Sequence, residues 1–326
     1  MGLVTTVPAE RVLVTGAAGF IGSHLCELLG GQGRQVAGVD NFDPYYGRAE
    51  KTNNVRCLEL AGATFSEGDI CDYDAFSALV ERVNPEVIVH LAAKAGVRNS
   101  VEHPRDYFVA NLQGTQNVLD VCRENDIERL VAASTSSVYG HTKILPFQED
   151  DPCIAPLHPY AATKRSGELL AGTYAHLYGL QATMLRFFTV YGPRGRPDMM
   201  PRLLLDSISN QTPVPLFEGP LERDWTYVAD IVDGIAAAVD HPLGFETLNL
   251  GRGAPLPLAE FIDELHRVSG GKANLVPKPR PASEMMSTYA STERLQDRLG
   301  IRPSVTVAEG VQDLWEWWQA SRPAGF

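Results

Sequence analysis

Residues 11–22, RVLVTGAAGFIG, decide the fold of this chain. The first six of these residues are mostly apolar, as in a buried strand, and the helical pattern IGSHLCELLGG (21–31) follows almost at once. Three glycines separate the two patterns: Gly16, Gly19 and Gly22. Glycines at a strand-to-helix turn let backbone N–H groups and the helix N-terminus approach a phosphate group. The segment therefore predicts a phosphate-binding loop at the edge of a parallel sheet.

Apolar runs and helical patterns alternate beyond this loop. Further strands are expected at 35–40, 63–70, 85–93, 129–134 and 182–188, and helices at 74–83, around 111–125 and at 161–178. Short strands separated by helices are typical of parallel β-α units. The sequence thus predicts the α/β class: a doubly wound parallel Rossmann sheet with a smaller C-terminal substrate-binding region.

The composition changes after Thr189, where two segments, YGPRGRPDMMP and QTPVPLFEGP, are rich in Pro and Gly. A helix at 228–240 and a strand at 245–251 have the pattern of the first region again, and 307–321 is expected to form a terminal helix. We therefore expect two domains. Residues 8–188, rejoined by 228–252, would bind the nucleotide cofactor, and 189–227 with 253–326 would bind the substrate.

Composition excludes several classes of protein. With 326 residues, 44% apolar and 21% charged, the chain can bury a sizeable core, which excludes a disordered or fibrous protein. A net charge of −12 argues against nucleic-acid binding through bulk electrostatics. No apolar run reaches the roughly 18–20 residues of a membrane span, and the N-terminus lacks a secretory signal pattern. The five scattered cysteines form no CxxC pair, so we expect free thiols, no metal site and a soluble protein of the reducing cytoplasm.

Asp40 indicates which dinucleotide binds, because it ends the second strand, 18 residues after Gly22. A carboxylate at this position accepts hydrogen bonds from the adenosine ribose and repels a 2′-phosphate, which favours NAD over NADP. Asp69 and Ile70 follow the third strand and suit contact with adenine. The expected NAD contacts are Gly16, Gly19, Phe20, Ile21, Gly22, Asp40, Asn41, Asp69, Ile70, Leu91, Ala92, Ala93, Lys94, Tyr160, Lys164 and Phe188.

A tyrosine and a lysine four residues apart, Tyr160 and Lys164, open the helix at 161–178 and share one of its faces. The lysine charge, together with that of the nicotinamide, should lower the pKa of the phenol, so that Tyr160 can act as a base near neutrality. A third member is expected after the strand at 129–134, within STSSVYG (134–140).

The glycine spacing and the YxxxK tetrad together resemble the extended short-chain dehydrogenase/reductase family. In that family's S-x-x-V-Y-G register, Thr135 takes the position of the catalytic hydroxyl. The resemblance therefore implies that Thr135, Tyr160 and Lys164 are catalytic. It also implies that Ser136 and Ser137 line the sugar pocket.

The residues after Thr135 discriminate among the reactions of the family. Sugar-nucleotide 4,6-dehydratases carry an Asp-Glu pair there, and UDP-glucuronate decarboxylases carry a Glu at the second position. This chain has Ser136 and Ser137 instead. Elimination and decarboxylation thus lack their usual acid-base group, whereas epimerisation at C4 does not need it.

Three further stretches look like UDP-glucuronate 4-epimerases: DNFDPYY (40–46), AGVR (95–98) and RFFTVYGPRGRPDM (186–199), in which Arg194 replaces the usual Trp. The resemblance implies that Thr189 and Arg196 bind the sugar carboxylate, since a guanidinium can hold a carboxylate bidentately. The other expected substrate contacts are Arg98, Ser136, Ser137, Leu216, Phe217, Arg223 and Arg280.

These features predict an NAD-dependent 4-epimerase of a UDP-sugar, which converts UDP-glucuronate to UDP-galacturonate through a transient 4-keto intermediate. The alternatives are a UDP-glucose/UDP-galactose 4-epimerase, a UDP-glucuronate decarboxylase and a non-catalytic NAD-dependent sensor. The family suggests a homodimer built on the helices that follow Asn111 and Tyr160.

Overall fold

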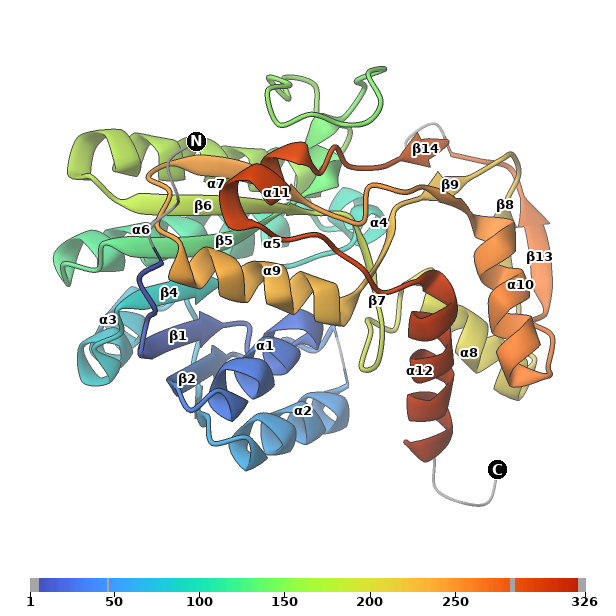
Figure 1. Ribbon diagram of the computed structural model, residues 1–326, viewed down its shortest axis with the longest axis horizontal. Helices are drawn as coiled ribbons and strands as arrows, with labels where there is room; N and C mark the ends of the chain where they lie inside the picture. Colours follow the sequence, from blue (N-terminus) through green and yellow to red (C-terminus); the bar gives the residue numbers. More distant parts are fainter. Residues whose placement is uncertain (1–5, 46, 282–284, 322–326) are drawn as a thin grey trace.

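A seven-stranded parallel sheet forms the centre of the molecule, in a computed structural model that describes residues 6–45, 47–281 and 285–321 (Figure 1). The strand order is β11-β6-β5-β4-β1-β2-β3. The strands are β1 (Arg11–Thr15), β2 (Gln35–Asp40), β3 (Thr64–Glu67), β4 (Val87–His90), β5 (Arg129–Thr135), β6 (Gln181–Phe187) and β11 (Glu246–Leu250). This order confirms the predicted doubly wound sheet, and β11 pairs with β6 in parallel.

Helices cover both faces of the sheet. One face carries α1 (Phe20–Gly31), α2 (Arg48–Leu60) and α9 (Val228–Asp240), and the other carries α3 (Tyr73–Val83), α6 (Gly114–Glu124) and α7 (Pro159–Tyr178). Alternation along the strands supplies both cores: Val12 and Val14 belong to the first, and Leu13 to the second. Both faces of a doubly wound sheet are buried, which is why a central strand such as β4, VIVH, is buried along its whole length.

Short elements and further helices complete the chain. Near the sheet edge lie α4 (Val97–Glu102), α5 (Pro104–Tyr107), the π-helix η1 (Phe108–Gln113) and the 3-10 helix η2 (Ser136–Tyr139). Beyond it lie β7 (Thr189–Tyr191), α8 (Met200–Asn210), β8 (Val214–Phe217), β9 (Glu222–Arg223), β10 (Trp225–Tyr227), β12 (Leu256–Pro257), α10 (Leu258–Ser269), β13 (Leu275–Lys278), β14 (Ser287–Thr288), α11 (Glu293–Leu299) and α12 (Val307–Ala320).

In Figure 1, α8, α10, α12, β8 and β13 lie to one side of the central sheet. We propose the division expected from the sequence, in which 8–188 with 228–252 bind the cofactor, and 189–227 with 253–326 bind the substrate. The pairing of β11 with β6 supports it. Residues 46, 282–284 and 322–326 of that division lie outside the described residues.

Helix α7 begins where it must to present Tyr160. The His158 side chain accepts a hydrogen bond from the Ala161 N–H at 3.2 Å, which caps the helix, and Pro159 occupies its first turn. Tyr160 therefore lies in the first turn, and Lys164 lies one turn further along the same face. Since α7 follows β5, its first turn lies near the carboxyl ends of the strands.

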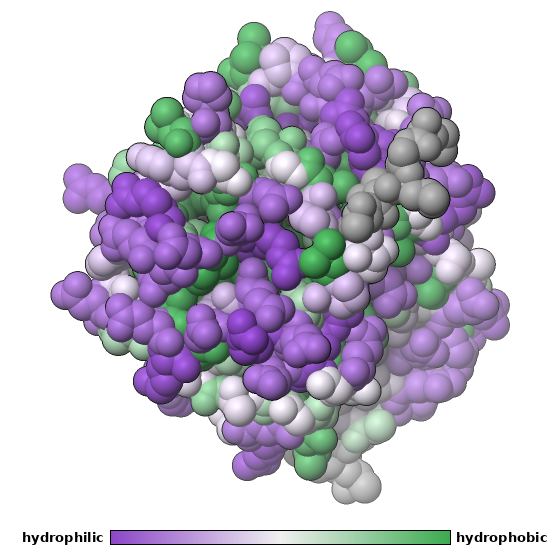
Figure 2. Space-filling model, turned by 60° about the vertical axis from the view of Figure 1, so that its left-hand side comes forward, coloured by the Kyte–Doolittle hydropathy of each residue, from purple (hydrophilic) through white to green (hydrophobic). Residues whose placement is uncertain are grey.

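Among the described residues, none of the helices combines the length and apolar character needed to cross a bilayer. Within the same ranges, no group of three or more His, Cys, Asp and Glu side chains could hold a metal ion. Hydrophilic side chains predominate on the face in Figure 2, and hydrophobic ones form small groups between them.

Candidate active site

A cavity of about 1310 Å³ lies at the carboxyl ends of the sheet strands, with a wall supplied by the smaller region. Residues from the ends of β2, β4, β5 and β6 line it, as do residues of β8, β9 and β10. Sites for one small molecule usually measure about 300–1,000 Å³, so this cavity has room for a dinucleotide and a second ligand. Ligands of open α/β sheets bind at this edge.

The glycine loop after β1 requires glycine for steric reasons. Gly16 has a φ of +73°, and a Cβ atom there would lie 2.7 Å from the Ala92 nitrogen. A Cβ on Gly22 would lie 2.2 Å from the Gly16 carbonyl oxygen. Gly19 precedes α1, and it lines the cavity with the first residues of the helix. The loop thus exposes a helix N-terminus to the cavity, which fits the pyrophosphate of a dinucleotide.

Asp40 is nearly buried at the end of β2, and its Oδ1 accepts hydrogen bonds from the Phe42 N–H at 2.8 Å and from Lys51 Nζ at 2.9 Å. The side chain of Lys51 is 8% exposed and belongs to α2. Sequence reasoning missed Lys51, because its segment lacks an apolar helical stripe. The predicted ribose site therefore contains a cation beside the carboxylate.

We expect the purified protein to carry NAD(H) and to prefer NAD+ over NADP+. The Asp40→Ala variant should retain less NAD, since the ribose loses its acceptor. It should also gain relative affinity for NADP+, because Lys51 remains to attract a 2′-phosphate. Identification of the nucleotide released on denaturation and titration of both cofactors into the stripped protein test this. A wild-type protein loaded mainly with NADP would contradict the assignment of Asp40.

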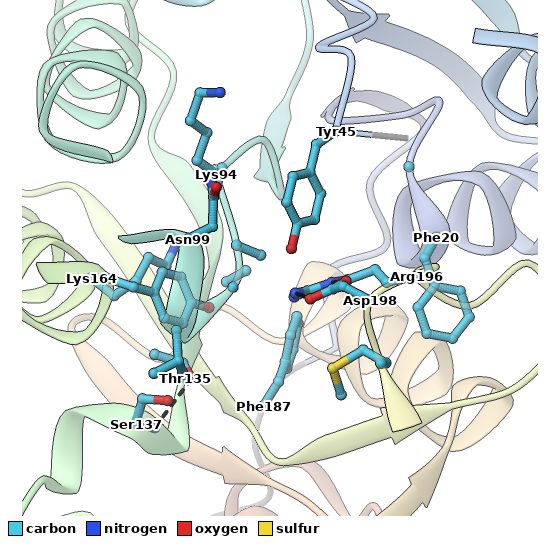
Figure 3. A pocket seen from close by; sticks show the side chains of 18 of the residues that line it. Phe20, Tyr45, Lys94, Asn99, Thr135, Ser137, Lys164, Phe187, Arg196 and Asp198 are labelled. Carbon is cyan, nitrogen blue, oxygen red and sulfur yellow. Dashed lines mark hydrogen bonds and ion pairs between the residues drawn. The ribbon is translucent and has the colours of Figure 1, made fainter. Parts of the chain in front are cut away.

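The predicted catalytic residues come together in the cavity. Thr135 ends β5 and hydrogen-bonds to the Tyr160 phenol, and its oxygen also accepts the Ser137 N–H at 3.2 Å. Lys164 is buried, and burial lowers its pKa to about 8, against the charge of Glu168, which raises it. In Figure 3, Thr135 and Lys164 lie on one side of the pocket, and Tyr45, Arg196 and Asp198 lie on the other.

The pKa of Tyr160 differs from the expectation. Burial raises it, and the opposing effects come from the positive charge of Arg196 and the hydrogen bond of Thr135, not from Lys164. The Lys164 charge acts instead on His90 and is itself influenced by Glu168. The positive charge that opposes the burial of the phenol is thus that of Arg196.

Arg196 is held in place by two residues that sequence reasoning missed. Its Nε and one terminal nitrogen donate to the two oxygens of Asp198, at 3.0 Å and 2.6 Å. The Tyr45 hydroxyl hydrogen-bonds to Asp198, and the guanidinium lies 5.7 Å from the centre of the Tyr45 ring. Tyr45 and Asp198 both lie within the stretches quoted above, but no sequence signal places Tyr45 beside residues about 150 positions later in the chain.

All the predicted cofactor residues line the cavity. The predicted substrate residues that line it are Arg98, Ser136, Ser137, Thr189, Arg196, Phe217 and Arg223. Two do not: Leu216, which packs against the core, and Arg280, which is exposed next to Pro281 of the lining. Leu216 and Phe217 are neighbours on β8, where side chains alternate in direction. The functional roles of all these residues remain predictions.

Two further residues explain local features of the site. Arg194 stands where the resembling epimerases have a Trp. It has a φ of +62° and bonds to Glu27 of α1, so it links its loop to that helix outside the cavity lining.

Asn111 is buried in η1 and exchanges hydrogen bonds with the backbone of Lys94, at 2.8 Å and 2.9 Å. Asn111 thereby fixes the loop after β4, on which four of the predicted cofactor residues lie.

The cavity has a different charge balance from that of the whole chain. Seven Lys and Arg residues and six Asp and Glu residues line it, although the chain has a net charge of −12. Attraction of an anionic ligand is therefore local.

The fold and this site define a dinucleotide-dependent enzyme of the Rossmann class that acts on a hydroxyl-bearing carbon. The chain belongs to the NAD dependent epimerase/dehydratase family, whose model matches residues 12–251. It is 38% identical to a UDP-glucuronate 4-epimerase of Thermodesulfobacterium geofontis, over 94% of this chain and 95% of that protein.

Solved structures with the same fold include UDP-sugar 4-epimerases. A UDP-glucuronic acid 4-epimerase from Bacillus cereus, in complex with UDP-glucuronic acid and NAD, has a TM-score of 0.87 and 34% identity, over 95% of this chain and 99% of that one. A UDP-glucose 4-epimerase from Thermotoga maritima, in complex with UDP-glucose, has a TM-score of 0.86 and 28% identity, over 95% and 99% of the two chains.

Proposed function

We propose that this chain is an NAD-dependent UDP-glucuronate 4-epimerase that converts UDP-glucuronate to UDP-galacturonate. The observation that carries the proposal is the content of one cavity, in which a Thr135–Tyr160 pair faces the Arg196 guanidinium. The Thr135–Tyr160 pair suits proton transfer at a hydroxyl-bearing carbon, and the guanidinium suits the binding of a carboxylate. The relatives that bind UDP-glucuronic acid and NAD support the same substrate and cofactor.

The chain's own residues act on the proton and the position of the sugar. Tyr160 takes the proton of the C4 hydroxyl, and Thr135 donates a hydrogen bond to the same oxygen. The glycine loop and Asp40 would hold NAD, which would supply the acceptor and donor of the C4 hydride once the 4-keto sugar has turned to present its other face. Tyr160 then gives the proton back. The configuration at C4 is thereby inverted, with no net oxidation.

Fidelity is a special problem for a uronic acid, because the 4-keto intermediate is a β-keto acid that can lose CO2. Loss of CO2 requires the carboxylate bond to align with the carbonyl π system. Arg196, with Thr189 beside the sugar, holds the carboxylate out of that alignment. Ser136 and Ser137 add no carboxylate that could act as an acid or a base.

The second candidate is a UDP-glucose/UDP-galactose 4-epimerase, which the similarity to the Thermotoga maritima enzyme favours. A neutral sugar gives Arg196 no carboxylate to bind. NMR analysis of the products from UDP-glucuronate and from UDP-glucose separates the two candidates. We expect UDP-galacturonate as the main product and faster conversion of the uronate. Turnover of UDP-glucose alone, or a UDP-pentose as the main product, would overturn the proposal.

We also propose a homodimer. Large apolar side chains are exposed on η1 and α7: Phe108, Val109, Leu169, Leu177 and Tyr178. Helices α6 and α7 pack side by side and could meet the same pair of a second copy. Light scattering after gel filtration should give twice the mass of 35.6 kDa, and a Leu169→Glu variant should shift it toward one chain.

A cytoplasmic location remains a prediction from the cysteines. All five are free thiols, and Cys26, Cys122 and Cys153 are buried. Burial raises the pKa of the Cys122 thiol to about 12, so the thiol stays protonated and inert.

A further inference from the structure

A buried charge network lies directly behind the catalytic residues. Glu168 of α7 and Arg186 of β6 are each 1% exposed. Arg186 donates from Nε and one terminal nitrogen to the two oxygens of Glu168, both at 2.9 Å. The Ser134 hydroxyl donates to the same carboxylate, and Arg165 donates to it at 2.7 Å. The carboxylate of Glu168 is thus bonded to two strands, β5 and β6, and to its own helix α7.

Each of these elements carries a part of the site. Ser134 directly precedes Thr135 on β5, and Glu168 follows Lys164 by one turn of α7. Arg186 and Ser134 are register partners on adjacent strands, just before the strands deliver their site residues to the cavity. A shift of the Glu168 carboxylate would therefore move more than one site element.

The same carboxylate influences the charge of Lys164. Burial lowers the pKa of Lys164, and the negative charge of Glu168 raises it. The pKa of Glu168 itself is lowered: burial raises it, but Arg186, Ser134 and Arg165 outweigh that effect. The carboxylate is therefore ionised near neutrality.

The neighbouring titratable groups are few. His90 of β4 faces Lys164 and is neutral, because burial lowers its pKa to about 3. On the other side of the network, Tyr139 of η2 lies under the Arg186 guanidinium, 4.8 Å from its ring centre. The Arg186 charge also acts on Cys153 and Glu149 of the loop before α7.

We propose that Glu168 is a positioning residue of the reaction: its carboxylate, held by Arg186, Ser134 and Arg165, fixes a negative charge one turn along α7 from Lys164 and joins α7 to the strand that carries Thr135. This inference rests on the proposed function only through the catalytic role of Lys164, which the Tyr160–Lys164 spacing predicts and which we take to require the charged form. Lys164 loses its proton as the pH rises through about 8. Activity should therefore fall on the alkaline side, and Glu168 should set where that fall begins.

The test compares pH profiles of wild type and the double variant Glu168→Gln/Arg186→Met. Removing both charges avoids a buried unpaired Arg186, which would destabilise the fold. Arg186 is not among the groups that shift Lys164, so the loss of Glu168 dominates. The alkaline limb of kcat should move down by about one pH unit, since a nearby opposite charge shifts a pKa by about that much or more. Any loss at pH 6, where Lys164 is charged in both proteins, measures the positioning effect, and the rate relative to wild type should fall by about a further tenfold between pH 6 and pH 9.

A matched control is available at the other end of the sheet. Arg34 and Asp240 form a similar bidentate pair, at 2.6 Å and 2.8 Å, away from the cavity lining. The double variant Arg34→Met/Asp240→Asn should keep the wild-type pH profile. If the Glu168→Gln/Arg186→Met profile matches wild type, or if its loss is equal at every pH, Glu168 does not govern Lys164.

A second measurement does not depend on turnover. The chain has only six lysines, so the 13Cε signal of Lys164 can be assigned in labelled protein by comparison with Lys164→Arg. Its titration midpoint should move down by about one pH unit in Glu168→Gln/Arg186→Met. An unchanged midpoint overturns the inference. A wild-type protein that titrates as expected but converts no UDP-sugar would instead refute the proposed function.

Discussion

The Tyr160→Phe variant should lose 4-epimerisation almost completely, with kcat about a hundred- to ten-thousandfold below wild type. The substitution removes only the hydroxyl that takes and returns the C4 proton. The ring, which packs edge-on against Tyr107 at 6.2 Å and stacks beside His158, stays in place. Folding and NAD binding should therefore be unchanged. The measurement is the rate of UDP-galacturonate formation, with circular dichroism and NAD content as checks on the fold.

Thr135→Val is the companion variant. It keeps the shape of the side chain but removes the hydrogen bond to the Tyr160 phenol. Since this hydrogen bond lowers the pKa of the phenol, the acid limb of the pH profile should also move to higher pH. We expect a smaller loss than for Tyr160→Phe, because the base remains. Near-normal turnover by Tyr160→Phe would exclude Tyr160 as the base.

In the Arg196→Ala variant, kcat/KM for UDP-glucuronate should fall roughly ten- to a hundredfold. The kcat/KM for UDP-glucose should fall far less. A charge-assisted pair with a carboxylate contributes on the order of 1.5–3 kcal/mol, and UDP-glucose has no carboxylate to lose. If Arg196 also holds the carboxylate out of line with the C4 carbonyl, the variant should release some UDP-pentose and NADH. NMR of the products detects UDP-pentose, and absorbance at the wavelength of the reduced cofactor detects NADH.

Arg194→Ala is the matched control for this experiment. It removes a guanidinium two residues away, on the same loop, that bonds to Glu27 and does not line the cavity. The ratio of the two substrates' kcat/KM should stay at the wild-type value in this variant. Equal losses on both sugars in Arg196→Ala would mean that Arg196 acts on the nucleotide or on the loop. A selective loss on UDP-glucuronate without any UDP-pentose would support a role of Arg196 in binding the carboxylate. It would exclude a role in preventing decarboxylation.

Local sequence patterns determined most of the nucleotide-binding half. The strand at 35–40 and the helix at 228–240 begin and end where the sequence predicted. These elements are decided by short-range effects: apolar periodicity, glycine at a tight turn, and Tyr and Lys four residues apart on one helix. The glycine loop and the Tyr160/Lys164 pair are local in the same sense, so no tertiary information was needed to find them.

Helix α2 was not predicted, because two of its four buried residues are the polar Lys51 and Asn54. Lys51 is buried because Asp40, on another element, accepts its hydrogen bond, and an apolar pattern cannot reveal such a position. Polar burial depends on a partner that the sequence does not name.

The tertiary structure alone decided which charges neutralise one another. Arg196 meets Asp198 and Tyr45 on one side of the cavity, and Glu168 meets Arg186 and Ser134 behind it. The sequence by itself determined the fold class, the cofactor loop and the catalytic pair, since each follows from residues near one another along the chain. Lys51 beside Asp40, Tyr45 beside Arg196 and Arg186 beside Glu168 come from elements far apart in sequence, and only the packing of sheet and helices brings them together.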